Sequence, residues 1–367
     1  MKKNNYLIIL TGTDPESRMG GIGFALPGYI QALKCAKIKY ISIPTYRPNS
    51  FYGKYCLFIF SIPRIIIQIL KSKINGNTPI IYSHVGSSIS LFREGCIVFV
   101  ARAFLSKTIM QIHCPEIIRY LKNPIQKKLV GLSFLAVNYL FVLTPWWKNY
   151  FINKGINKSI EIIPNPMPLD WERKANETRS VSNVKRRISV LVMARIVEGK
   201  GADLMIEALP FLDENFKVEI AGDGAMLPYL RKRVKELNLT DKVRFHGWVS
   251  GEEKQHLIDM ADIFCHPTQL DAMPMSILEA MANSLPVVAI DWGPISDLVP
   301  DFIAGVLIPD NDPKLLANAI NSLRDLEKRK TIGEAGRIRV LREYTSRKIG
   351  KDLEKLFLNL KELSRTI

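Results

Sequence analysis

The chain has 367 residues, of which 47% are hydrophobic and 23% charged, and a formal net charge of +16. These fractions are ordinary for a globular protein, and the length argues against a single core and for two domains of about 170 to 190 residues. The five cysteines form no Cys-x-x-Cys pair and no leader-like segment precedes the first expected strand, which argues against a disulfide framework and for a reduced, cytosolic chain.

The positive charge lies almost entirely in the first half of the chain. Residues 1–170 contain 21 Lys and Arg and 6 Asp and Glu, a net charge of +15, whereas the remainder contains 30 and 29, a net charge of +1. A field of this size favours an anionic partner for the first half, either a nucleic acid or an anionic membrane surface.

The first expected elements are a strand at Tyr6–Leu10, a glycine-rich loop and a helix from about Phe24. Gly20, Gly21 and Gly23 would let the backbone approach a phosphate closely. The spacing is not G-x-G-x-x-G and no G-K-[ST] follows, so a P-loop is excluded. A flexible connection between strand and helix explains these residues equally well.

Two strongly apolar segments follow, at residues 51–74 and 129–143. Pro63-Arg64 interrupts the first, so that neither of its apolar sides reaches the roughly 20 residues that span a bilayer. The second segment is likewise too short, and we expect no transmembrane helix. Residues 51–74 suit either an amphipathic surface helix with basic flanks or a core helix of an α/β domain.

Strands are expected at Ile80–Ser83 and Thr108–Ile112. His113 follows the second strand directly and would lie at the carboxyl edge of a parallel sheet, where open α/β sheets bind their ligands. The alternative is a loop histidine bonded to backbone. His84 also ends a strand and is a weaker candidate.

The polar stretch 171–187 is the expected linker, and a strand at Ile188–Met193 opens a second α/β domain. Arg195 and Lys200 follow that strand, before a helix beginning near Ala202. Two cations five residues apart at this place can bind two phosphates and stabilise a departing diphosphate. A solvated basic turn is the alternative.

Further strands are expected at residues 218–224 and 243–250, and the most informative stretch is 261–290. It contains Asp271 in a loop and Glu279 one turn into a helix that begins at Met275. The N-terminus of that helix suits a phosphate, and the two carboxylates suit hydroxyl groups, so the ligand these features favour is a sugar nucleotide. Otherwise Asp271 caps its loop and Glu279 is a solvated acid.

The alternation of short strands and helices predicts an α/β protein with two doubly wound parallel-sheet domains. We place them at residues 1–170 and 188–346. The closing helix, about residues 347–367, is amphipathic and is expected to pack back on the first domain.

The sequence D-AMPMSIL-EAMANSLPVVA, residues 271–289, resembles the signature of the retaining, nucleotide-sugar-dependent glycosyltransferases of family 4. Glu279 matches the second acid of that signature, and Asp271 stands where the family has a Glu. The run from Ala194 through Arg195 to Lys200 is similar to the family's G-R-L-x-x-x-K-G motif. Thr144, Gly155 and Pro164-Asn165 match a run in the family's first domain. The resemblance is specific over residues 188–310 and diffuse over 1–170.

The resemblance implies the GT-B architecture, in which two Rossmann-like domains face each other across a cleft. It also implies that the second domain binds the donor and the first the acceptor. The implied catalytic residues are His113, Arg195, Lys200, Asp271 and Glu279. The implied donor-binding residues are Gly21, Gly23, Gly222, His246, Gly247, Met273, Pro274, Met275 and Ser276.

The expected function is transfer of a hexose from a UDP- or GDP-sugar, with retention, to a hydroxyl of a lipid-linked saccharide in bacterial surface polysaccharide synthesis of the O-antigen or capsule type. We expect no metal and no other cofactor, and a cytoplasmic protein held peripherally at the inner face of an anionic membrane. One alternative is a nucleotide-sugar epimerase of the same fold. The other is a non-enzymatic nucleic-acid-binding protein, although we find no interleaving of basic and aromatic residues and expect no nucleic-acid partner.

Overall fold

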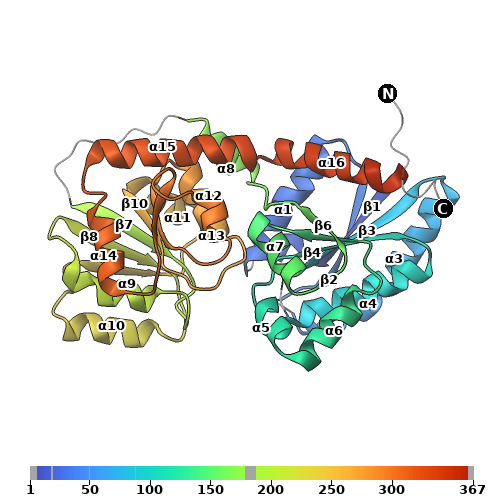
Figure 1. Cartoon of the computed structure of the whole chain (residues 1–367), viewed down its shortest axis with the longest axis horizontal. Coiled ribbons are helices and arrows are strands. Elements are labelled where there is room, and N and C mark those ends of the chain that lie inside the picture. The colour runs from blue at the N-terminus through green and yellow to red at the C-terminus, as the bar shows by residue number, and fades with distance from the viewer. Residues whose placement is uncertain (1–5, 18–19, 49, 87, 178–186, 363–367) are drawn as a thin grey trace. The chain divides into compact units, whose positions relative to one another are not determined.

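The structure, a computed structural model, describes residues 6–17, 20–48, 50–86, 88–177 and 187–362 (Figure 1). The chain forms two compact units. The first comprises Met1–Leu169 together with Tyr344–Ile367, and the second comprises Asp170–Glu343.

The first unit contains a six-stranded sheet of order β2-β1-β3-β4-β5-β6 in which every pair of neighbouring strands is parallel. Its strands are apolar almost throughout because helices cover both faces of a parallel sheet; Ile8, Ile9 and Leu10 of β1 are all buried. The strands are β1 (Tyr6–Thr13), β2 (Tyr40–Tyr46), β3 (Thr78–Val85), β4 (Lys107–Ile112), β5 (Tyr139–Val142) and β6 (Ser159–Ile162).

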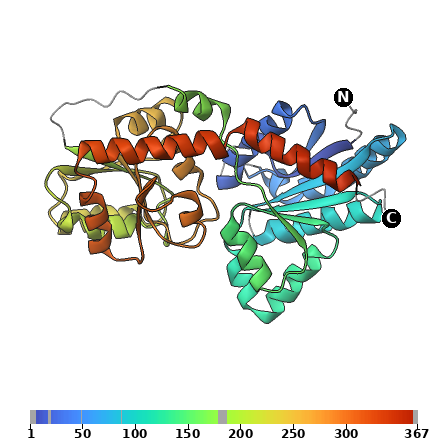
Figure 2. The same ribbon diagram turned by 45° about the horizontal axis from the view of Figure 1, so that its top comes forward.

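The helices of the first unit divide between the two faces of the sheet. On one face, Ile65 of α3 and Ile97 of α4 pack on Ile9, Ile43 and Ile81 of the strands, and α6 packs against α4. On the other face α1 and α16 lie side by side (Figures 1 and 2). The helices are η1 (Pro15–Ser17), α1 (Gly20–Cys35), α2 (Phe51–Tyr55), α3 (Leu57–Ile74), α4 (Ser88–Ala103), α5 (Ile117–Lys122), α6 (Pro124–Phe134), α7 (Pro145–Asn153) and α16 (Ser346–Glu362).

The second unit contains another parallel six-stranded sheet, of order β12-β11-β10-β7-β8-β9. The strands are β7 (Ile188–Met193), β8 (Phe216–Ala221), β9 (Val243–Gly247), β10 (Ile263–His266), β11 (Val287–Ile290) and β12 (Gly305–Ile308). The helices are α8 (Leu169–Ala175), α9 (Ala202–Ala208), η2 (Leu209–Phe211), α10 (Leu227–Glu236), α11 (Gly251–Met260), α12 (Met275–Ala282), α13 (Ile295–Leu298), α14 (Pro313–Asn321) and α15 (Leu326–Glu343).

Each sheet has one point at which the strand order reverses. In the first unit β1 lies between β2 and β3, and in the second β7 lies between β8 and β10. The loops that leave the carboxyl ends of two such strands run in opposite directions and leave a crevice between them, which is where doubly wound proteins bind ligands. The two switch points are therefore between β1 and β3 and between β7 and β10.

The expected parallel α/β fold is confirmed, but two local predictions are wrong and one strand was not predicted. Helix α1 begins at Gly20 rather than near Phe24, so the glycines lie in its first turn and not in a loop. The expected linker, residues 171–187, begins within α8, whose Trp171 and Ala175 are buried, and residues 178–186 lie outside the described residues. Strand β2, which contains Pro44, was not expected; it is an edge strand, where a missing N–H is tolerated.

The apolar segment 51–74 forms α2 and α3. Helix α3 packs on the core along one side, as a core helix would, and is exposed along another, as a surface helix would be. One side of α3 is buried against the sheet at Ile65 and Ile69, whereas Ile67 and Ile74 are exposed. In the described part of the chain, no helix has the length and hydropathy needed to cross a bilayer.

Candidate functional site

The switch point of the second unit brings together two side chains that lie 71 residues apart. Lys200 lies in the loop after β7, and Asp271 lies in the loop after β10. The Lys200 Nζ donates to Asp271 Oδ2 at 3.1 Å and to the carbonyl oxygen of Leu270 at 3.2 Å. Both side chains keep about a quarter of their surface exposed, 21% and 26%, so the pair is accessible to a ligand.

His266 is a third member of this cluster, and it was not predicted from the sequence. It ends β10, is only 4% exposed, and its Nε2 lies 3.9 Å from Asp271 Oδ2. Within the described residues that nitrogen has no hydrogen-bond partner. Burial lowers the pKa of His266 to about 4, with Asp271 opposing the shift and Lys200 adding to it. The ring is therefore neutral at pH 7 and adds no positive charge beside Asp271.

Gly201 sets the distance between the two loops. It has φ +77°, and a Cβ at this position would lie 1.8 Å from the carbonyl oxygen of Pro267. Thr268 Oγ1 also donates to the carbonyl of Lys200 at 3.2 Å. Only a glycine permits this approach, so the loop that carries Lys200 is held directly against the loop that leads to Asp271.

The loop after β7 also meets the ends of β8 and β9. Gly222 has φ +151°, and a Cβ there would lie 1.9 Å from the carbonyl oxygen of Ala194. The Gly222 N–H donates to the Gly247 carbonyl at 2.6 Å. These two expected donor-binding glycines thus lie together beside Arg195, whose side chain is exposed.

Helix α12 begins at Met275, as predicted from the sequence. Met273, Pro274 and Met275 are buried and Ser276 is half-buried. Asp271 Oδ1 accepts the backbone N–H of Ala272 at 3.0 Å, which fixes the carboxylate ahead of the helix.

Glu279 is not the solvated acid of the alternative interpretation, which is wrong. It is 3% exposed, and Lys254 Nζ of α11 lies 2.6 Å from its Oε1. The same ammonium lies 5.4 Å from the ring centroid of Trp171. Burial raises the pKa of Glu279 above its ordinary value, although Lys254 acts in the opposite direction.

His246 of β9 is linked through Glu219 to Lys217, and both of these residues lie on the neighbouring strand β8. Its Nε2 lies 2.7 Å from Glu219 Oε2, and Lys217 Nζ lies 2.6 Å from Glu219 Oε1. Burial acts to raise the pKa of Glu219, but the hydrogen bonds from Lys217 and His246 outweigh burial and lower it. This arrangement fixes the His246 ring to the sheet.

In the first unit His113 pairs with His84. His84 Nδ1 lies 3.0 Å from His113 Nε2, and the two rings are stacked with centroids 5.2 Å apart. Burial lowers the pKa of His84 well below its ordinary value and that of His113 to about 3. Both rings are therefore neutral at pH 7, and one of them donates to the other.

These buried histidines predict a loss of stability in mild acid. A histidine whose pKa is lowered by folding binds more protons in the unfolded chain, so stability is complete above about pH 6.5 and falls as the pH drops, by about 1.4 kcal/mol per pH unit for each histidine. We expect the urea midpoint to fall between pH 7.5 and 5.5, and to fall less in His84→Gln. The exposed His256 provides the matched control, His256→Gln; an identical pH dependence in both variants would contradict the assignment.

Gly21 and Gly23 lie in the first turn of α1. Gly21 is exposed and has open space where a Cβ would be, whereas Gly23 is buried. Together with His113 they belong to the first unit, and the residues near Lys200 belong to the second.

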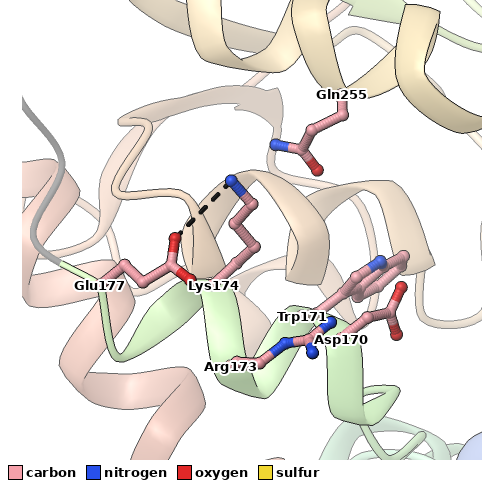
Figure 3. Close-up of a pocket in the computed structure, with 6 residues that line it drawn as sticks. All are labelled: Asp170, Trp171, Arg173, Lys174, Glu177 and Gln255. Carbon is pink, nitrogen blue, oxygen red and sulfur yellow. Dashed lines mark ion pairs between the residues drawn. The ribbon is translucent and has the colours of Figure 1, made fainter.

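A separate pocket of about 300 Å³ lies on the second unit, between α8 and α11 (Figure 3). Lys174 and Glu177 form an ion pair of 3.7 Å on its wall, and Gln255 faces them from α11 (Figure 3). None of the expected site residues lines it. The lining residues are Asp170, Trp171, Arg173, Lys174, Glu177 and Gln255.

No three His, Cys, Asp or Glu side chains are grouped to hold a metal ion in the parts of the chain that the structure describes. The polar groups at the β7–β10 switch point are instead one ammonium, one carboxylate and one neutral imidazole. Such a set can bind an anion beside hydroxyl groups.

The second unit is similar in sequence to known glycosyltransferases. Residues 174–339 match the family model described as glycosyl transferases group 1. The uncharacterized glycosyltransferase MJ1607 of Methanocaldococcus jannaschii is 31% identical over 151 residues, which cover 41% of this chain and 39% of that protein. The putative colanic acid biosynthesis glycosyltransferase WcaL of Escherichia coli is 29% identical over 180 residues, which cover 46% and 44%. The chain thus spans about two fifths of the length of these two curated relatives.

Among solved structures, Anabaena HepE in complex with UDP and glucose superposes with a TM-score of 0.73. The sequences are 17% identical, and the alignment covers 96% of this chain and 99% of that one. The two six-stranded parallel sheets with their flanking helices are those of the GT-B fold, as expected from the sequence.

Proposed function

We propose that this chain, whose second unit matches the glycosyl transferases group 1 almost end to end, is a glycosyltransferase that uses a nucleotide sugar. We assign it to the retaining enzymes of family 4 and to hexose transfer from a UDP- or GDP-sugar. The complex of HepE with UDP and glucose supports a nucleoside diphosphate donor, and the relative named for colanic acid biosynthesis supports a role in bacterial surface polysaccharide synthesis.

The observation that carries the proposal is the cluster of Lys200, Asp271 and His266 at the switch point of the second sheet. A diphosphate placed there would attract the Lys200 ammonium away from Asp271, because two negative charges on the ligand outweigh one carboxylate. Asp271 would then accept hydrogen bonds from sugar hydroxyls, and His266 would remain a neutral ring beside it. The exposed Arg195 and the N-terminus of α12 would bind the remaining phosphate oxygens.

The reaction itself exchanges one bond for another. The bond between the anomeric carbon and the diphosphate oxygen breaks, a bond from that carbon to the acceptor oxygen forms on the same face, and the acceptor proton passes to the departing diphosphate. No carboxylate of the chain acts as a nucleophile in this proposal. Positioning and stabilisation of the leaving group therefore supply the rate enhancement, without a metal ion.

The other expected residues take supporting roles. Glu279 would accept from the ribose hydroxyls if Lys254 turned away from it, and Gly222, Gly247 and His246 would bound the nucleotide. His113, with Gly21 and Gly23, would contribute from the first unit. We propose a lipid-linked saccharide as the acceptor, and a cytoplasmic, peripheral position at the inner membrane face.

Thermal-shift measurements with UDP, GDP and their hexose conjugates test the donor. At a ligand concentration about 100 times Kd, binding contributes about 2.7 kcal/mol, which raises Tm by roughly 5 °C or more in a unit of this size. The shift should be nearly lost in Lys200→Ala and kept in Lys330→Ala, which removes another lysine of the second unit from an ion pair, the one with Glu327 on α15. No shift with any nucleotide would refute the proposal, and an epimerised sugar formed from donor alone would favour the epimerase.

A further inference from the structure

One face of the first unit carries a group of exposed apolar side chains on three helices. We call it the outer face: the exposed apolar side chains of α3, α4 and α6 that point away from the sheet. These three helices lie next to one another (Figure 1). The outer face consists of Phe60, Pro63, Ile67, Leu70 and Ile74 on α3, Ile89, Phe92 and Phe99 on α4, and Ile125, Leu129 and Leu132 on α6.

These residues are spaced so that they form a continuous apolar stripe along one side of each helix. On α3 they recur at intervals of three, four, three and four residues, and the opposite side of the same helix, Ile65 and Ile69, is buried against the sheet. Helix α3 is thus apolar on two sides, although only one has a partner in the described structure. At 18 residues it is about 27 Å long, so it could rest along a surface and present its whole stripe to it.

The chain segment that contains the outer face has charges almost entirely of one sign. Residues 17–160 contain 19 Lys and Arg against two acids, Glu94 and Glu116. Glu94 is fully buried, where Thr11 donates to it at 2.8 Å and Arg93 lies 3.2 Å away. Lys71 and Lys73 are exposed at the end of α3.

The start of the same segment is aromatic. Phe51, Tyr52 and Tyr55 of α2 are all exposed, with Phe51 and Tyr55 in ring contact at 4.9 Å and Tyr52 and Phe60 at 5.7 Å. Amphipathic rings beside basic side chains are typical of the interface between lipid headgroups and water.

We propose that the outer face, with the exposed rings of α2, is the surface by which this protein docks on an anionic lipid bilayer. The apolar stripes enter the boundary between headgroups and acyl chains, and Lys71, Lys73 and Arg64 meet the lipid phosphates. This inference rests on the proposed membrane location and names the surface responsible. A second copy of the chain is a poorer occupant, because it would bring two cationic rims together. A nucleic acid would match the charge but not the apolar stripes.

Co-sedimentation with vesicles of phosphatidylcholine alone, or with 30% phosphatidylglycerol, in about 0.1 M and 1 M salt tests the proposal. The whole chain should bind the anionic vesicles at low salt and release at high salt, because the Debye length falls from about 10 Å to about 3 Å. Ile67→Ser with Leu70→Ser should weaken the partition by about tenfold or more. Lys71→Gln with Lys73→Gln should weaken it by roughly fivefold for each charge.

Matched controls remove equal apolar area or charge from the second unit. They are Ile303→Ser with Ile338→Ser, and Lys232→Gln with Lys235→Gln, all exposed positions. Equal binding to neutral vesicles, or equal loss in controls and test variants, would overturn the proposal. The proposal would also be overturned if the whole chain formed a dimer and the α3 variants dissociated it without changing vesicle binding. The same holds if the lysine variants lost binding to RNA but kept binding to vesicles. The nucleotide-induced shift in Tm, measured on the same samples, keeps the two proposals separate, since the α3 variants should retain it.

Discussion

Replacing Lys200 by alanine is expected to slow glycosyl transfer by roughly 10² or more, and Arg195→Ala is expected to have a similar effect. Both cations lie in the loop that leaves β7, and in the proposed reaction negative charge grows on the diphosphate oxygens as the bond to the sugar breaks. A group that stabilises this growing charge acts mainly on the transition state, so kcat should fall more than KM rises.

The assay is release of the nucleoside diphosphate, followed with the donor that gives the largest thermal shift. Lys330→Ala is the matched control, because it removes a lysine from an ion pair far along the chain on α15. Turnover close to that of the unaltered protein in both Lys200→Ala and Arg195→Ala would refute their assignment as groups that stabilise the leaving diphosphate.

Replacing Lys254 by methionine is expected to destabilise the protein by about 3 kcal/mol near neutral pH. Glu279 is 3% exposed, and Lys254 is the cation 2.6 Å from it. Without that partner a buried carboxylate must either remain charged or take up a proton, and both cost free energy. The loss should be measured as the change in the free energy of unfolding by urea.

The pH dependence identifies the cause. The pKa of Glu279 is already raised by folding, so the folded chain binds more protons than the unfolded chain. Stability therefore decreases as the pH rises from the pKa of Glu279 in the unfolded chain to its higher pKa in the folded chain. Removing Lys254 should raise this pKa further. The deficit of Lys254→Met should therefore be greatest at pH 7.5 and smaller in acid.

Two further variants complete this test. The double variant Lys254→Met with Glu279→Gln should recover much of the loss, because no buried charge remains unpaired. Lys232→Met, which breaks an exposed pair with Glu236 at 3.7 Å, should change stability by under about 1 kcal/mol. A deficit in Lys254→Met that is independent of pH and unaffected by Glu279→Gln would assign the effect to packing on Trp171 instead.

Much of the second unit follows from short-range patterns in the sequence. The strand at Ile188–Met193, the helix start at Ala202 and the helix start at Met275 all lie where they were expected. The central strands β7, β10 and β11 are short, mostly apolar runs, so the hydrophobic pattern predicts them directly. The placement of Lys200 and Asp271 at the carboxyl edges of neighbouring strands follows from the alternation of strands and helices.

What the sequence could not reveal depends on contacts between distant segments. The approach of His266 to Asp271 depends on how the β10 loop closes, and the pairing of Glu279 with Lys254 depends on how α11 packs beside α12. The early start of α1 at Gly20 runs against the low helix propensity of glycine. The exposed stripes of α3 and α4 could be read only once the sheet had shown which side of each helix is buried.

Hydrogen–deuterium exchange of the whole chain, with and without the donor that binds most tightly, tests the central claim most directly. If the ligand's diphosphate lies between the loops after β7 and β10, peptides covering residues 194–201 and 266–276 should become protected, and Lys200→Ala should remove that protection at the same donor concentration. Protection confined to other segments, such as the α8 pocket at residues 170–177, with these two loops unchanged, would contradict it.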